Sequence, residues 1–317
     1  MCGRYAASRS PDDLVEEFEV VEDRTRDPES PPVSPDYNIA PTKTAPVVLE
    51  RRPRTGAVSE DGVAPSDPPG AGSEGDGSGG GVDDGTEPGR DTEAGAGGGG
   101  EGGAVRQLRP LVWGLVPSWA KDRSVGSRLI NARAESLLEK PAFRKAAIGR
   151  RCLVPADGWY EWQKSPTVKD RKGKPRKQPF FVSDSEGDVL AFAGVYEFWR
   201  DPERDPEDPE AWLTTYAIVT TSAVGQMERL HDRMPLALPR EHWDRWLDPD
   251  VQDPDEVRGL LVPGDVARFV LTPVSTLVNN VRNEGPELVE PLAVEDLVGV
   301  VDPVTGEVYG GQGDALF

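Results

Sequence analysis

The 317-residue sequence has few of the residues that build covalent frameworks and metal sites, with only two cysteines and two histidines. Cys2 and Cys152 are too few for a disulfide framework and lack the paired CxxC spacing of a zinc site, which suits a reducing cytosol. No run reaches the roughly 18 apolar residues of a membrane span. We therefore expect a protein of the cytoplasm that needs no metal or cofactor.

Lysine is also scarce. The chain has 9 lysines beside 27 arginines and 56 acidic residues, for a net charge of −20. This imbalance is typical of the surface of a halophile's protein, where net charge reflects adaptation to the solvent. Acidity ordinarily argues against nucleic acid as a partner. Here the distribution of the bases carries more information than their sum, so an anionic ligand is not excluded.

Aromatic residues are missing altogether from residues 55–105, which hold 18 of the 35 glycines, eleven acids and the single base Arg90. Such a segment cannot bury enough apolar surface to offset the entropy of ordering it, so it is predicted to be a disordered insertion. A compact domain tolerates an insertion of this kind because loop-closure entropy grows slowly with length. Residues 1–54 and 106–300 are then expected to form one domain, and residues 301–317 a C-terminal tail.

Short apolar runs separated by Gly, Pro and Asp turns indicate many strands and few helices. We expect strands at residues 45–50, 108–116, 151–155, 179–183, 189–196 and 215–220. Helices are expected at residues 11–18, 131–145 and 240–247, and the helix at 240–247 is predicted to be the final one. No repeated βαβ unit is present. The pattern favours an α+β domain built on a curved, mainly antiparallel, barrel-like sheet flanked by a few helices.

The position of Cys2 directly behind Met1 is unusual. If Met1 is removed, Cys2 carries an α-amine and a thiol on adjacent carbons, with reference pKa values near 8 and 8.5. Two membrane interpretations fail, because N-myristoylation needs Gly at position 2 and a lipoprotein cysteine needs an apolar signal segment before it. The alternative is that Cys2 is an accident of where translation starts.

Two titratable residues stand in suggestive surroundings. Glu161, in GWYEWQ, lies between aromatic residues that could desolvate its carboxyl group and raise its pKa, or it faces outward from a strand. His231, in RLHDRMP, is a candidate proton carrier, although a lone histidine is more often structural. The other histidine, His242, lies among charges on the last predicted helix, and we interpret it as part of a solvated face.

Two amides and two tryptophans leave their roles open. Asn38 in YNIAPT and Asn131 in NARAES stand beside turns or helix starts, where N-caps are the simplest explanation. Trp113 and Trp119 in WGLVPSW are either core residues or, beside Gly and Pro turns, flat surfaces available to a ligand.

The most basic window of the chain is KSPTVKDRKGKPRK, residues 164–177, which holds seven bases and one acid. It is either a solvated hairpin tip or a phosphate-binding element.

Taken together, the motifs resemble a known family. MCGRY at the start, YNIAPT, WGLVPSWAKD, NARAES, ADGWYEW, TTSA followed by HDRMP, and VNNVRNEGPELV occur in this order over about residues 1–291. They resemble the SRAP family, described both as SOS-response-associated peptidases and as sensors of abasic sites in DNA. The chain departs from that family in its acidic insertion, its overall acidity and the extra basic stretch after Glu161.

The resemblance implies a covalent function in the DNA damage response. Met1 would be removed, and Cys2 would crosslink to an abasic site in single-stranded DNA or at single-strand/double-strand junctions. Some lyase activity is implied, and peptidase activity would be limited to self-processing. The implied roles are positioning of the reacting groups by Asn38 and Asn131, proton transfer by Glu161 and His231, phosphate binding by Arg4, Arg133 and Arg233, and apolar surfaces for bases at Trp113, Pro117 and Trp162. With DNA as its partner, the protein would be associated with the nucleoid, and we expect a monomer.

The chemistry of an aminothiol agrees with this implication. Its amine forms an imine with the open-chain aldehyde of an abasic sugar, and the neighbouring thiol then closes a five-membered thiazolidine. A lysine would stop at a hydrolysable imine. Opening the sugar ring and expelling water both need proton transfer, for which a carboxylic acid of raised pKa and an imidazole are suited.

Two alternatives remain. Class II glutamine amidotransferases also begin Met-Cys-Gly and use the α-amine as a base. That match ends at three residues, and the arginine-glycine motif expected further along is missing. The second alternative is a protease that acts on other proteins. Release of ammonia from glutamine, or turnover of a peptide substrate, would distinguish them.

Overall fold

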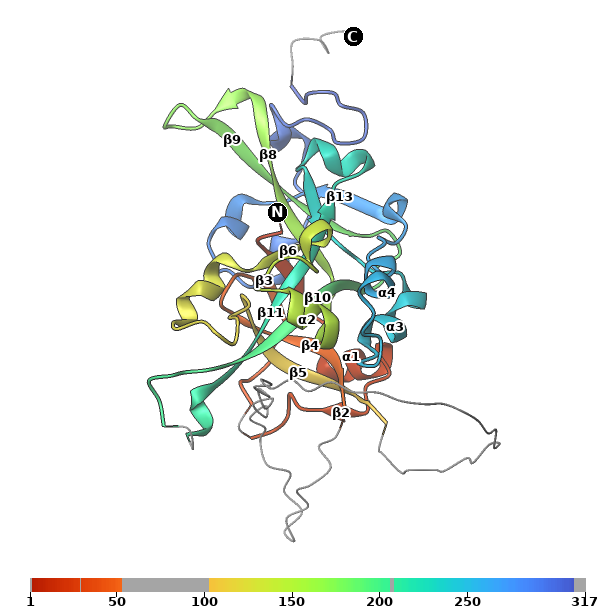
Figure 1. The fold of residues 1–317 in the computed structure, drawn as a ribbon. Helices are drawn as coiled ribbons and strands as arrows, with labels where there is room; N and C mark the ends of the chain where they lie inside the picture. The colour runs from red at the N-terminus through yellow and green to blue at the C-terminus, as the bar shows by residue number, and fades with distance from the viewer. Residues whose placement is uncertain (1, 29, 53–102, 206–207, 311–317) are drawn as a thin grey trace, which may run out of the picture. The chain divides into compact units, whose positions relative to one another are not determined.

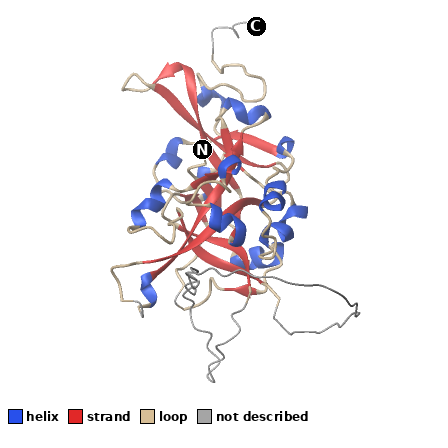
Figure 2. Ribbon diagram, in the orientation of Figure 1, coloured by secondary structure: helices blue, strands red, loops and turns tan. Residues whose placement is uncertain are grey.

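A closed ring of five strands forms the centre of the protein (Figures 1 and 2). The structure, a computed structural model, describes residues 2–28, 30–52, 103–205 and 208–310. Removal of Met1 and nearly all of the predicted insertion lie outside the described residues. The ring consists of β4 (Thr44–Arg51), β5 (Val105–Trp113), β7 (Arg151–Ala156), β10 (Leu190–Arg200) and β11 (Trp212–Ser222).

The ring is antiparallel except where it closes. β11, β10, β7, β4 and β5 pair antiparallel in that order, and β5 then pairs in parallel with β11 through Val112 and Thr215. The short strands β2 (Glu22–Asp23), β6 (Asn131–Arg133) and β12 (Arg233–Pro235) pair at its edges. This confirms the predicted curved, mainly antiparallel, barrel-like sheet.

A second, five-stranded sheet lies against the ring. Its order is β13 (Phe269–Pro273), β9 (Pro175–Asp184), β8 (Gly158–Lys169), β1 (Tyr5–Ala7) and β3 (Asp36–Ile39), all antiparallel. β8 follows β7 after a single residue, so the chain passes directly from one sheet to the other.

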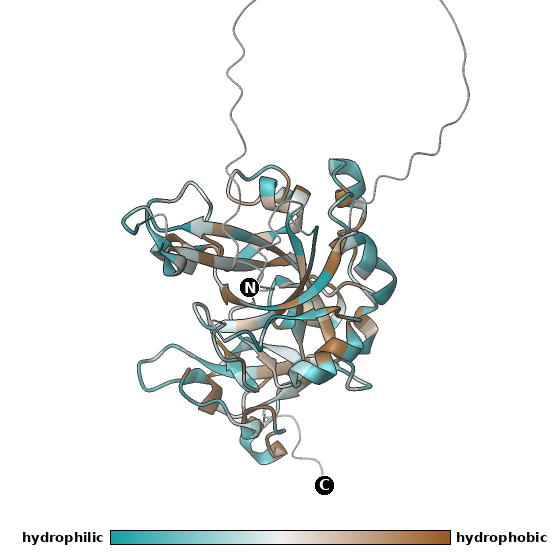
Figure 3. Ribbon diagram, turned by 90° about the horizontal axis from the view of Figure 1, so that it is seen from below, coloured by the Kyte–Doolittle hydropathy of each residue, from teal (hydrophilic) through white to brown (hydrophobic). Residues whose placement is uncertain are grey.

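Alternate residues of the ring strands face two different cores. Cys152 and Val154 of β7 lie in the inner core between the sheets, whereas Leu153 between them lies in an outer core with the helices. β10 behaves in the same way, because Phe192 packs inward and Ala193 outward. Strands buried on both faces explain why their sequences are nearly continuous apolar runs. In Figure 3, hydrophobic residues (brown) are frequent on the central strands, and hydrophilic residues (teal) are frequent on the loops.

In the described residues, four short α-helices accompany the strands: α1 (Pro11–Glu17), α2 (Arg144–Gly149), α3 (Trp243–Leu247) and α4 (Pro254–Gly259). Ser10 caps α1 with a reciprocal capping box to Asp13. The 3₁₀ segments are Arg123–Arg128, Ala134–Ser136, Pro209–Ala211, Gly225–Arg229, Arg240–His242, Val266–Arg268, Thr276–Asn279, Pro286–Leu288 and Val294–Leu297. No helix within the described ranges is long and apolar enough to cross a membrane.

Two helix predictions need correction. The helix expected at residues 131–145 does not form: Asn131–Arg133 is strand β6, and α2 begins only at Arg144. Pairing of β6 with β11 overrides local helix propensity, and Pro141 prevents a continuous helix. The helix expected at residues 240–247 is present as a 3₁₀ turn followed by α3, but α4 follows it, so it is not the last helix.

Candidate functional site

The pairing of β1 with β8 brings the start of the chain to Glu161. Tyr5 pairs with Trp159, and the Tyr160 N–H donates a hydrogen bond to the Arg4 carbonyl at 3.0 Å. Antiparallel strands pair residues in opposite directions, so continuing this register places residues 2 and 3 beside Glu161. A residue at the end of the chain and a residue in mid-sequence therefore meet through backbone pairing alone.

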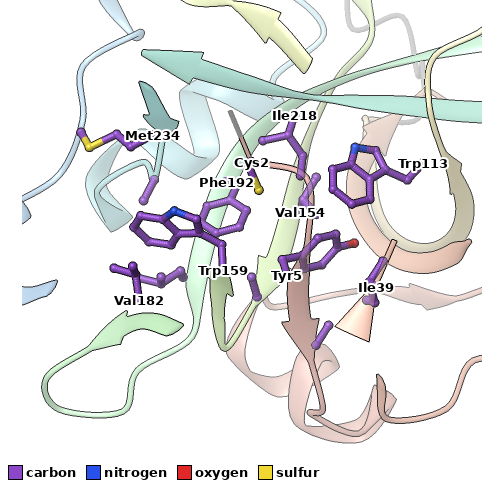
Figure 4. Close-up of a cluster of buried hydrophobic side chains, with 14 of the residues drawn as sticks. Cys2, Tyr5, Ile39, Trp113, Val154, Trp159, Val182, Phe192, Ile218 and Met234 are labelled. Atoms are coloured by element: carbon purple, nitrogen blue, oxygen red, sulfur yellow. The ribbon is translucent and has the colours of Figure 1, made fainter. Parts of the chain in front are cut away.

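Cys2 is fully buried at the edge of the inner core (Figure 4). Its side chain lies among Phe192, Ile218 and Val154, and its Sγ lies 3.8 Å from the Arg4 carbonyl oxygen. Burial raises the pKa of the thiol, and the nearby charge of Glu161 raises it further. Cys2 is accordingly a neutral thiol at pH 7.

Glu161 is also buried, with 3% of its surface exposed. Burial raises the pKa of its carboxyl group to about 7, although the positive charge of the chain's α-amino group opposes the rise. A carboxyl group with this pKa exists in both protonation states near neutral pH, so it can donate and accept protons. Glu161 is desolvated as expected, although Tyr160 and Trp162 project from the opposite face of β8, and its catalytic role stays a prediction.

Strand β11 brings two further candidate residues, Asn131 and Arg233, toward this site. β6 pairs with β11 along Asn131–Arg133, and β12 pairs with the end of the same strand through Arg233. The Asn131 Nδ2 donates a hydrogen bond of 2.6 Å to the Cys2 carbonyl oxygen. Asn131 is thus no helix N-cap, and it ties the N-terminal segment to the ring.

His231 precedes β12 and is partly buried, with 35% of its side chain exposed. Its Nδ1 lies 2.6 Å from Asp232 Oδ1 and 3.0 Å from the backbone nitrogen of Arg233. Only one of these contacts is a hydrogen bond at a time, because a protonated Nδ1 donates and an unprotonated Nδ1 accepts. Burial lowers the pKa of His231, with a further contribution from the chain's α-amino charge. The ring is therefore neutral at pH 7 and accepts the Arg233 N–H.

Arg233 is held by protein groups and is poorly placed for the phosphate role implied for it. Its Nη1 and Nη2 bind the two carboxylate oxygens of Glu135 at 2.7 and 2.9 Å, and Nη2 also donates to the Thr220 carbonyl at 2.6 Å. With 9% of its surface exposed, Arg233 clamps β12 to the segment after β6. These bonds hold Nη1 and Nη2, whereas Nε has no partner among the described residues, and the phosphate contact implied for Arg233 stays a prediction.

Asn38 fixes the loop at residues 276–283. Its Nδ2 donates to the carbonyl oxygens of Val278, Asn280 and Asn283, and its Oδ1 accepts from Arg4 Nη1 at 2.7 Å. Asn38 is fully buried in β3, so it is not an N-cap. The motif VNNVRNEG could have indicated this loop, but only the tertiary contacts reveal that Asn38 organises it.

Arg4 and Arg133 keep cationic surface available. Arg4 is partly buried and bonds through Nη1 to Asn38 and to the Val278 carbonyl. Arg133 is exposed and makes no ion pair with the residues that the structure describes. Both remain candidates for phosphate contacts.

The predicted apolar surfaces divide into buried and accessible residues. Trp113 is fully buried against Tyr5, with its Nε1 bonded to the Ile130 carbonyl, and Pro117 is buried as well. Neither has an exposed face in this structure, and their roles as surfaces for bases stay predictions. Trp162 is partly exposed and donates to Asn279 Oδ1 at 2.7 Å, and Trp119 is 66% exposed.

One cluster of carboxylates has the spacing of a cation site. Asp184, Glu186 and Asp188 converge, but Arg268 Nη2 lies between them at 2.9, 3.1 and 2.6 Å. The guanidinium group satisfies these carboxylates itself. In the described part of the chain this is the only such cluster.

Comparisons with known proteins agree with this architecture. The curated relatives include the abasic site processing protein YoqW of Bacillus subtilis, 43% identical over 184 residues that span 58% of this chain and 76% of the relative. The abasic site processing protein HMCES of Rattus norvegicus is 34% identical over 59% of this chain and 57% of its own length.

Solved structures share the fold. A protein of Bordetella bronchiseptica superposes with a TM-score of 0.54 at 18% identity, covering 86% of this chain and all of that one. A second, described as phage-related and from the same organism, gives a TM-score of 0.50 at 25% identity, over 86% of this chain and 94% of its own. The profile described as "SOS response associated peptidase (SRAP)" matches residues 1–281, and the chain belongs to that family.

Proposed function

We propose that this protein recognises abasic sites in single-stranded DNA, or at junctions with duplex DNA, and bonds to them covalently through Cys2 after loss of Met1. Curated relatives named abasic site processing proteins support the substrate class. The buried Cys2, with Glu161 beside it, supports the chemistry. Family membership also supports a place in the DNA damage response.

The proposed reaction consumes an aldehyde and releases one water. The α-amine of Cys2 attacks the open-chain aldehyde carbon of the abasic deoxyribose, and loss of water leaves an imine. The Cys2 sulfur then bonds to the same carbon while a proton reaches the nitrogen, which closes the thiazolidine. Because burial keeps the thiol protonated, the amine is the first nucleophile and a base must assist the second step.

Glu161 and His231 are assigned to the proton transfers. Glu161, with a pKa of about 7, donates a proton to the sugar ring oxygen and later accepts the thiol proton. The neutral His231 assists ring opening and, in the reverse direction, release of Cys2. Asn131 positions the aminothiol through its hydrogen bond to the Cys2 carbonyl.

One observation carries the proposal: Asn131 holds the backbone of Cys2 at 2.6 Å, next to a buried carboxyl group whose pKa is about 7. An accidental cysteine at position 2 would need neither the anchor nor the tuned acid. The test is intact-mass spectrometry of purified protein after incubation with an abasic oligonucleotide. The expected mass is that of protein without Met1 plus the oligonucleotide minus one water.

The matched variants are Cys2→Ser and Cys152→Ser. Cys2→Ser is expected to give no heat-stable adduct, because a hydroxyl group is too weak a nucleophile to close the ring efficiently. Cys152→Ser is expected to react like wild type, since Cys152 is a buried thiol of β7 that pairs with Gly194 of β10. An undiminished adduct from Cys2→Ser would refute the thiazolidine. Ammonia release from glutamine, or turnover of a peptide, would favour an amidohydrolase or a protease instead.

A further inference from the structure

The hairpin of β8 and β9 continues well beyond the site, and the site itself does not use this extension. Gln163 pairs with Gln178, Lys164 with Lys177, and Lys169 with Pro175 near the turn. Figure 1 shows the β8–β9 end projecting away from the neighbouring strands. We call residues 164–177 the basic arm.

The cations of the basic arm are available to a partner. Six of its seven bases are exposed, and none forms an ion pair with any described residue. Its one acid, Asp170, accepts the backbone N–H groups of Lys172 and Lys174 and so stabilises the turn. Elsewhere in this acidic chain many cations are neutralised, as Arg106 is by Glu50 and Asp244.

The register of the arm places like charges together. Lys164 and Lys177 are directly opposite in an antiparallel pair, so their side chains project from the same face. Like charges at this position destabilise a sheet. A polyanion that lies along the face would convert this repulsion into attraction.

The opposite face of β8, at the base of the arm, is braced by residues 299–301, where the expected domain ends and the expected C-terminal tail begins. Gln163 exchanges two hydrogen bonds of 2.8 Å with the backbone of Val301, and Ser165 Oγ donates to the Gly299 carbonyl at 2.6 Å. Gly299 has a φ of +76°, and a Cβ there would lie 2.3 Å from Val168. The arm is therefore a supported element, in which the lysines of the free face are presented from a fixed backbone.

The arm is continuous with the candidate site. Lys164 follows Glu161 by three residues, and its charge contributes to the lowered pKa of His231, so the two lie near each other. Trp162 projects from the same strand face as Lys164 and is partly exposed. An aromatic surface followed by cations is the combination that binds a nucleic acid strand.

We propose that the basic arm binds the phosphate backbone of the same DNA on one side of the abasic site. This inference rests on the proposed function. It adds a DNA contact that lies on only one side of the abasic site. From Glu161 to Lys169, β8 rises about 26 Å at about 3.3 Å per residue. B-form DNA spaces the phosphates of one strand by about 3.4 Å along its axis, so the arm reaches about eight nucleotides from the reacting sugar.

The test measures binding to abasic oligonucleotides extended from the abasic site by 2, 5, 8 or 12 nucleotides on the 5′ side only or on the 3′ side only. Each is offered with the extension single-stranded or duplex. We expect affinity to increase with length up to about eight nucleotides for one polarity only. Lys169→Gln/Lys172→Gln removes two exposed charges of the arm without touching the Asp170 contacts and should abolish that increase.

Salt dependence gives a second readout. If both lysines contact phosphates, the slope of log K against log salt should decrease by about 1.4 on single strands and about 1.8 on duplex. The ratio of wild-type to variant affinity then shrinks about 7- to 12-fold between 50 and 200 mM salt. The control Lys140→Gln/Lys145→Gln removes the same amount of charge from two exposed lysines, one before α2 and one within it. Because α2 packs in the outer core and is not part of the arm, this variant should keep the wild-type dependence on length and on salt.

The outcomes separate the two proposals. Equal length dependence on both sides, or an increase that survives in Lys169→Gln/Lys172→Gln, would overturn the arm as a DNA contact while adduct formation persists. A stronger effect of the variant on RNA or on an acidic protein than on DNA would assign the arm to another partner and equally overturn the inference. Failure of the proposed function is different, because wild-type protein would then form no adduct with any of the oligonucleotides.

Discussion

Glu161 is the residue whose environment gives the clearest dependence on pH. Its pKa rises from an ordinary value of 4.5 to about 7 because it is buried. Well below pH 4.5 the carboxyl group is protonated in both the folded and the unfolded state, so its ionisation does not affect the free energy of unfolding. Between pH 4.5 and 7 the unfolded state loses its proton first, so the free energy of unfolding declines as pH rises and levels off above pH 7.

Glu161→Gln should remove this decline. A pKa change from 4.5 to about 7 corresponds to about 3 kcal/mol, so the variant should gain up to that amount relative to wild type between pH 5 and pH 8. Urea unfolding of both proteins at the two pH values measures the difference. The same variant should form the crosslink more slowly at saturating DNA. Identical pH profiles for the two proteins would mean that Glu161 titrates normally.

At the residue scale, sequence neighbours predicted some environments and not others. The desolvated carboxyl group of Glu161 was expected, but not for the right reason: side chains alternate along β8, so Tyr160 and Trp162 project from the opposite face and pack with each other. Trp113 and Trp119 belong to one motif, yet one is fully buried and the other is 66% exposed. A tryptophan beside Gly and Pro turns suits a core and a surface equally, so only the packing decides.

The clamp between β12 and the segment after β6 allows a test of whether Arg233 has a structural role and Arg133 a role in DNA binding. Arg233→Ala removes a bidentate contact to Glu135 and a bond to the Thr220 carbonyl, and should lower the free energy of unfolding by about 2 kcal/mol. Arg133→Ala, on an exposed side chain, should change it by less than about 0.5 kcal/mol. Arg133→Ala should instead weaken DNA binding and reduce the salt slope by about 0.7.

Thermal melts and salt titrations of the two variants decide between these roles. Wild-type stability in Arg233→Ala, combined with a reduced salt slope, would assign Arg233 to a phosphate contact and not to the clamp. A destabilised Arg133→Ala would show that its exposed side chain has a structural contact.

At the element scale, the predicted strands were confirmed where an apolar run marks them, as in β7 and β10. The helix expected at residues 131–145 was wrong because Asn131–Arg133 is recruited by β11, almost 90 residues further along the chain. Periodicity carries no information about such long-range pairing. The same limit hid the function of Asn38, whose partners are about 240 residues away.

For the whole molecule, strand count and turn spacing were sufficient to predict a curved, mainly antiparallel sheet. They did not predict its closure, which depends on a short parallel pairing between β5 and β11. The bracing of the basic arm by residues 298–301 was also unforeseen, since that segment has no strong periodicity. Closure and bracing both depend on backbone contacts between distant segments, which composition does not encode.

The acidic insertion gives a prediction for the molecule as a whole, because its flanks are paired. Arg51 of β4 pairs with Val105 of β5 in an antiparallel ladder, so the ends of the segment are adjacent. Replacing residues 53–102 with six Gly and Ser residues shortens the connection from about 53 to about nine residues. The lower loop-closure entropy should stabilise the fold by about 1.5 kcal/mol, seen as a melting temperature about 3 to 6 °C higher.

The same replacement removes eleven acidic and two basic residues and changes the net charge from −20 to −11. Repulsion of DNA should weaken, so affinity for an abasic oligonucleotide should increase at 50 mM salt and converge with wild type near 1 M, where the screening length is about 3 Å. A control of full length, with the eleven acids changed to Asn or Gln, should match the affinity gain but not the stability gain. A shortened protein that loses its cooperative melt would show that residues 53–102 contribute to the core, and equal affinities at low salt would show that their charge does not reach the DNA.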